Sequence, residues 1–164
     1  MIKIDEMGLK LCRMQAKVFE ISLAKEECSS LIFMRRFMNS QVARRMDAGG
    51  FLFEACDVNQ IIEEVDAEFG ESSYGSEKYT ENEMYWIGYM YRYWAYTYQQ
   101  TSKQINRIIK PKELRSLYYP YHSLDPAQAI ERILEARGVA VNEEDLTARG
   151  VELLREIIKR ESRK

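Results

Sequence analysis

The stretch MYWIGYMYRYWAYTY, residues 84–98, decides the fold, because it holds six tyrosines and both tryptophans of the protein. Read at helical spacing, its large side chains form two stripes on different faces. A helix that is apolar around most of its circumference is stable only when other elements enclose it. We therefore predict a buried central helix over about 81–99. The stripes are Met84, Ile87, Tyr91, Ala95 and Tyr98, and Trp86, Tyr89, Tyr93 and Tyr96.

Apolar residues recur every three or four positions through most of the remaining chain, which indicates further helices. Their starts carry capping residues, such as Thr80 with Glu83 and Thr101 with Gln104. The fold class is therefore all-α, a compact single-domain bundle (1–164) of seven or eight helices around the aromatic helix. Residues 51–53 are expected to be an irregular link and 70–79 a mobile loop. The other helices are expected at about 5–24, 31–46, 57–69, 101–109, 111–118, 125–137 and from 142 onward.

Gly88 lies inside the aromatic helix, where glycine costs roughly 1 kcal/mol relative to alanine. Its expected use is the close approach of a neighbouring helix, and the second helix is the candidate.

Composition and charge argue for a cytoplasmic protein and against several classes. The net charge of -2 gives no global reason for a nucleic-acid or membrane partner, and no apolar run approaches the ~20 residues of a membrane span. The first residues lack the pattern of a secretory signal. Cys12, Cys28 and Cys56 are far apart and form no metal-binding motif, so they are expected to be reduced and mostly buried. We predict no metal and no cofactor.

Charge is distributed unevenly along the chain. Residues 54–83 carry ten acidic side chains and one basic side chain, Lys78. Ordinary solvated helix faces would explain this pattern, but a concentrated acidic surface can also attract a partner. We predict that the acidic face of the 57–69 helix and the adjoining loop bind a partner protein. The candidate residues are Glu63, Glu64, Asp66, Glu68 and Glu71.

Residues 101–119 have the outline of a basic helix-turn-helix, which gives an alternative function as a DNA-binding transcriptional regulator. The proline at 111 and the apolar residues after it favour packing instead. Exposed aromatic rings could also stack on bases, but Arg92 is the only cation between residues 84 and 100, so burial explains the rings better. The DNA-binding candidates are Lys103, Arg107, Lys110, Lys112 and Arg115.

Catalytic chemistry has one weak candidate. His122 is the only histidine and stands beside Ser123 and close to Asp125, but sequence neighbours seldom present the geometry of a catalytic triad. An enzyme with its site near Tyr121 and His122 is therefore the third reading. We predict no catalytic residues.

Two strings carry a resemblance: YWIGYMYRYW at 85–94 and LYYPYHSLDPAQAIERIL at 117–134. They resemble a family of small uncharacterised bacterial cytoplasmic proteins from toxin–antitoxin-type gene neighbourhoods, with similarity from about 37 to 138. The resemblance implies a compact helical protein that binds a partner, as an antitoxin does. The leading expectation is a non-enzymatic protein–protein interaction module that binds and neutralises a toxin.

Overall fold

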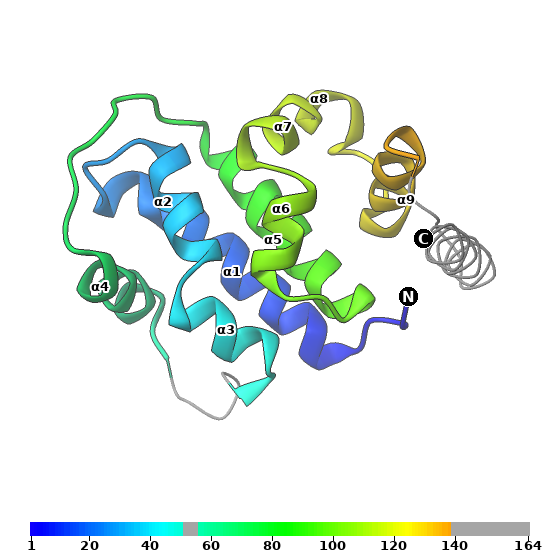
Figure 1. Cartoon of the computed structure of the whole chain (residues 1–164), viewed down its shortest axis with the longest axis horizontal. Coiled ribbons are helices and arrows are strands. Elements are labelled where there is room, and N and C mark those ends of the chain that lie inside the picture. Colours follow the sequence, from blue (N-terminus) through cyan, green and yellow to red (C-terminus); the bar gives the residue numbers. More distant parts are fainter. Residues whose placement is uncertain (51–55, 139–164) are drawn as a thin grey trace, which may run out of the picture. The chain divides into compact units, whose positions relative to one another are not determined.

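The computed structural model describes residues 1–50 and 56–138, and the regular structure of these residues is entirely helical (Figure 1). The all-α prediction is confirmed. The described residues form nine helices, seven of which have at least seven residues. They are α1 (Glu6–Lys25), α2 (Ser30–Met38), α3 (Gln41–Asp47), α4 (Val58–Phe69), α5 (Glu81–Tyr98), α6 (Ser102–Ile108), α7 (Pro111–Ser116), α8 (Tyr118–Tyr121) and α9 (Pro126–Ala136).

The chain divides into two compact units, Met1–Ser123 with α1 to α8 and Leu124–Lys164 with α9. The single domain over 1–164 stays a prediction. The expected link at 51–53 and the expected helix from 142 lie outside the described residues. Within the described part of the chain, no helix combines the length and apolar character needed to cross a bilayer.

α1 and α5 form the most extensive helix pair of the first unit and lie side by side in Figure 1. Gly88 lies at their closest approach, where an added Cβ would be 2.9 Å from both Ala16 Cα and the Gln15 carbonyl oxygen. The expected close approach of a helix is therefore correct. Its partner is α1, whereas the sequence suggested the second helix.

The aromatic helix α5 is enclosed on one side more completely than on the other. Tyr91 and Trp94 are almost fully buried, at 0% and 1% exposure, and Tyr93 is buried as well. Trp86 is only half-buried, and Tyr85 is 37% exposed. The central buried helix predicted from the sequence is confirmed, but part of its second stripe reaches the surface.

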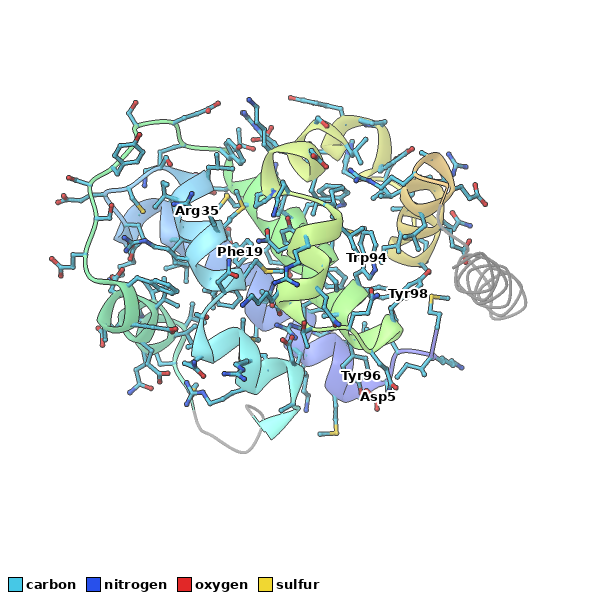
Figure 2. All side chains as sticks on the ribbon, viewed as in Figure 1. Asp5, Phe19, Arg35, Trp94, Tyr96 and Tyr98 are labelled. Carbon is cyan, nitrogen blue, oxygen red and sulfur yellow. The ribbon has the colours of Figure 1, made fainter. Side chains whose placement is uncertain are left out.

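Two ring contacts of α1 extend this core. Phe19 packs edge-on against Phe33 and Phe37 of α2, with ring centroids 5.9 and 5.1 Å apart. At the other end of α1, the Tyr96 hydroxyl donates to Asp5 Oδ1 at 2.7 Å. Figure 2 shows Asp5 and Tyr96 together at that end, with Phe19 further along the pair.

The predicted helix over 31–46 is wrong in one respect, because the chain breaks at Asn39 and Ser40 into α2 and α3. The Ser40 hydroxyl donates to the Phe37 carbonyl at 2.7 Å and accepts from the Ala43 N–H at 3.1 Å. It therefore ends one helix and caps the next. The apolar stripe continues across the break, which is why periodicity alone did not reveal it.

Capping residues mark several helix starts as the sequence predicted. Thr80 with Glu83 and Thr101 with Gln104 form complete capping boxes at α5 and α6. Pro111 opens α7, which ends at Ser116, before the expected residue 118; α8 follows as a separate short turn. Cys12 and Cys28 are buried and Cys56 is half-buried.

A buried guanidinium joins four helices. Arg92 of α5 is 1% exposed, and its Nε donates to Gln15 Oε1 at 2.7 Å. Its Nη1 donates to Asp47 Oδ1 at 2.7 Å and its Nη2 to Ser102 Oγ at 2.9 Å. Ser102 also donates to Asp47 through its backbone N–H and its hydroxyl. The network satisfies a charge that would be costly to bury alone.

The expected loop 70–79 contains no helix and is fastened to the turn between α1 and α2. The Ser29 N–H donates to the Tyr74 carbonyl and the Ser30 N–H to the Glu77 carbonyl, both at 3.0 Å. Lys78 Nζ donates to the Glu26 carbonyl at 2.6 Å. These bonds hold the segment against the C-terminal end of α1.

Candidate functional site

An acidic pocket lies where the C-terminal end of α1 meets α4 and the segment that follows α4. Its volume is about 330 Å³ and most of its lining is polar. Among the described residues that line it, Lys25 is the only cation, against four carboxyl groups. We call it the acidic pocket. It is lined by Lys25, Glu26, Glu27, Asp66, Glu71, Ser72 and Ser73.

Two helix ends shape the acidic pocket. At the end of α1, Glu26 leaves the helix in an extended conformation while its N–H still donates to the Ser22 carbonyl at 2.9 Å. At the end of α4, Gly70 adopts a positive φ. This conformation is favourable for glycine and strained for most other residues. The turn leads the chain from Phe69 toward Glu71 at the pocket.

Glu26 is the unusual residue of the acidic pocket. Its side chain is only 8% exposed, and its Oε1 atom accepts no hydrogen bond in the described structure. Burial raises its pKa to about 7, and hydrogen bonding and charge repulsion from Asp66 act in the same direction. The only donor to its carboxylate that the described residues show is the Cys28 thiol, 3.8 Å from Oε2. A buried carboxylate with so weak a donor is costly, so Glu26 favours a state in which a proton or another cation neutralises it.

Asp66 and Glu71 are the two predicted partner-binding residues that the structure brings together in this pocket. Asp66 is half-buried beside Glu26, and Glu71 is exposed at the rim. The sequence analysis missed Glu26 and Glu27, which complete the site from α1. Their sequence signal is an acidic pair directly after the last turn of that helix, but only the tertiary fold places it next to α4.

The other three predicted acidic residues lie elsewhere on α4. Glu64 forms an ion pair with Arg45 of α3. Glu68 Oε2 accepts a hydrogen bond from the Gln41 N–H at 2.8 Å, at the start of α3. Glu63 is exposed and does not line the pocket. Two of these carboxylates thus stabilise the α3–α4 packing.

Of the five basic residues predicted to bind DNA, one forms ion pairs within the protein and four are exposed. Arg115 forms ion pairs with Glu77 at 2.9 Å and Glu83 at 3.3 Å, and its guanidinium lies 3.9 Å from the centre of the Tyr79 ring. These contacts hold α7 against the start of α5. Because its charge is paired within the protein, Arg115 is a poor candidate for DNA binding. The exposed residues are Lys103, Arg107, Lys110 and Lys112.

His122 is exposed, and its ring stacks on Tyr118 with centroids 4.7 Å apart. Its Nδ1 lies 2.9 Å from the Tyr118 carbonyl oxygen. These contacts are local to one turn and favour a structural role. Among the described residues, no group of three or more His, Cys, Asp or Glu side chains is arranged to hold a metal ion.

Comparisons with protein-family models, with curated proteins and with solved structures find no match to this chain.

Proposed function

We propose that this protein is a non-enzymatic protein-binding module, and that its acidic pocket receives a lysine or arginine side chain of a partner protein. The observation that carries the proposal is the buried Glu26 carboxyl, which lines the pocket beside Asp66 and holds a proton near neutral pH because burial and its acidic neighbour raise its pKa. An ammonium or guanidinium group inserted at this pair of carboxyl groups would neutralise it in place of the proton.

The surrounding charges support a cationic occupant. Glu27 and Glu71 are exposed at the pocket. They can therefore attract a basic segment before its side chain enters. Asp66 deepens the negative potential at the wall next to Glu26. Lys25 at the pocket and Lys78 beside Glu26 offset two of these charges, against four carboxyl groups, which leaves the pocket acidic.

The volume argues for a side chain rather than a large ligand. The acidic pocket measures about 330 Å³. It is therefore at the small end of the range in which proteins bind small molecules. One long basic side chain fits this space. The family resemblance seen in the sequence suggests the class of partner, a toxin enzyme whose activity the complex blocks.

Coexpression with the product of the adjacent gene tests this function. We expect the two proteins to copurify, and we expect a growth arrest caused by the neighbour alone to be relieved by coexpression. The proposal is contradicted if the neighbouring gene product does not copurify and its effect on growth is the same with and without coexpression.

DNA binding is the alternative, favoured by the exposure of Lys103, Arg107, Lys110 and Lys112. Two observations weaken it. Arg115 is already paired with Glu77, and α7 has only six residues with which to contact a DNA groove. This alternative predicts a gel shift of the upstream duplex that disappears steeply with added salt. The absence of any shift at low salt would eliminate it.

A further inference from the structure

A second pocket, different in character, lies between α2 and the turn that joins α6 to α7. Its volume is about 230 Å³ and its lining is mostly apolar. We call it the apolar pocket. Leu31 and Ile32 contribute from α2, and Pro111 contributes from the start of α7. Leu31 is 37% exposed, which leaves apolar surface open to water beside the pocket.

Three cations surround the apolar pocket. Arg35 belongs to α2, and Figure 2 shows it on that helix. Lys110 and Lys112 flank Pro111 on the opposite side. All three residues are exposed, and the described residues that line the pocket include no acidic side chain. An occupant is therefore expected to combine an apolar group with negative charge around it.

Asn106 adds a polar group within the apolar lining. It is 5% exposed, and its Oδ1 is buried without a hydrogen-bond partner in the described structure. Leaving such an acceptor unsatisfied costs about 1–3 kcal/mol. This oxygen has almost no accessible surface, so the choice of occupant rests on the apolar lining and the surrounding cations, which favour a ligand that also carries negative charge.

We propose that the apolar pocket is a docking site for an acidic segment of a partner protein, which inserts one large apolar side chain between carboxylates that pair with Arg35, Lys110 and Lys112. The pocket is smaller than the usual small-molecule site and fits one such side chain. The phosphate backbone of DNA has no apolar side chain to insert. The apolar lining of the pocket therefore favours a protein partner over a nucleic acid. This site is independent of the acidic pocket and of the partner that binds there.

Fluorescence anisotropy with labelled peptides tests the proposal. The probes are short peptides with one Leu, Phe or Trp flanked on both sides by glutamates, and matched peptides with Ser at the central position. We expect at least one apolar probe to bind the full chain, and its Ser counterpart to bind about tenfold more weakly. Equal binding of both peptides, or no binding of any apolar probe, overturns the proposal.

Charge-matched variants separate pocket binding from general attraction. Lys110→Glu/Lys112→Glu should weaken binding of the apolar probe by about tenfold or more, since both residues border the pocket. Lys103→Glu/Arg107→Glu changes the net charge equally on exposed residues outside it, and should have a much smaller effect. Equal losses in the two variants overturn the proposal. Circular dichroism checks that both variants are folded.

Two other occupants give different results. If duplex DNA binds and both double variants weaken it equally, the basic surface is a nucleic-acid site and the proposal fails. If the unliganded protein self-associates and Lys110→Glu/Lys112→Glu abolishes the association, the occupant is a second copy of this chain and the proposal also fails. A folded Leu31→Ala variant that keeps full affinity for the apolar probe contradicts insertion into the pocket.

Discussion

Arg92 is the centre of a buried hydrogen-bond network that connects four helices of the first unit. Its guanidinium binds Gln15, Asp47 and Ser102, and so connects α5 with α1, α3 and α6. Arginine suits this position because its planar group presents several donors in fixed directions. The sequence showed only a solitary cation in an aromatic helix; its buried partners come from three distant segments.

Arg92→Met leaves the mostly buried carboxylate of Asp47 without its cation. It should therefore destabilise the protein by about 3–5 kcal/mol. Urea unfolding followed by circular dichroism measures the loss. As a control, Arg107→Met removes an exposed arginine of α6. The control should change stability by no more than about 0.5 kcal/mol. Equal stability of the two variants would show that the buried network contributes little.

Glu26 gives a prediction about pH. Its pKa is about 7 in the folded protein against a usual 4.5, so the folded state holds its proton where the unfolded state has lost it. The stabilising contribution is complete below about 4.5 and is lost as pH rises through about 7. The groups acting on Glu26 are Asp66 of α4, Cys28 of the following turn and Lys78 of the 70–79 segment.

Glu26→Gln replaces the acid with a neutral group of the same shape and should remove this loss. We expect the variant to gain stability relative to the natural protein as pH rises from about 4.5 to 7, with the largest difference above pH 7. Urea unfolding of both proteins across this pH range measures the difference between their free energies of unfolding. The titration of other groups affects both proteins equally and cancels in this difference. A difference that does not vary with pH would contradict a raised pKa at Glu26.

Helices were predictable where the sequence carried local signals. The aromatic run and the capping box at Thr80 predicted α5 almost to the residue. The break at Ser40 escaped prediction because the apolar stripe does not change there, although Asn39 and Ser40 are residue types that favour helix ends. The acidic pocket was half predictable: Asp66 and Glu71 share a local acidic stretch, whereas Glu26 reaches them only through the packing of α1 against α4.

The α1–α5 contact depends on the absence of a side chain at Gly88. Gly88→Ala should improve the helix propensity of α5 by about 1 kcal/mol. The new Cβ would nevertheless press on the backbone of α1 at Gln15 and Ala16. Overpacking of this kind costs about 1–3 kcal/mol, so we expect a net loss of stability.

Thermal unfolding measures this effect against Gly50→Ala, where an added Cβ has no described neighbour within 4 Å and the backbone needs no positive φ. The control should leave the melting temperature nearly unchanged. A stabilised Gly88→Ala variant would show that α1 and α5 can separate at little cost.

At the scale of the molecule, the first unit combines a helical core with the acidic pocket and the apolar pocket, which are opposite in character. The acidic pocket joins α1, α4 and the segment after it, and the apolar pocket joins α2, α6 and α7. The core fixes both, because α1 packs on α5 and α2 contacts α6 and α7. In the function that we propose, the acidic pocket binds a basic side chain of the partner protein.

Calorimetric titration of the copurified partner tests that role most directly, with the natural protein and two charge-matched variants. Glu27→Gln/Glu71→Gln neutralises the exposed acids of the acidic pocket, and Glu63→Gln/Glu81→Gln neutralises two exposed acids outside it. We predict that the pocket variant raises the dissociation constant by about tenfold or more, while the control changes it by less than about twofold. Equal effects of the two variants, or full affinity of the pocket variant, would contradict the account.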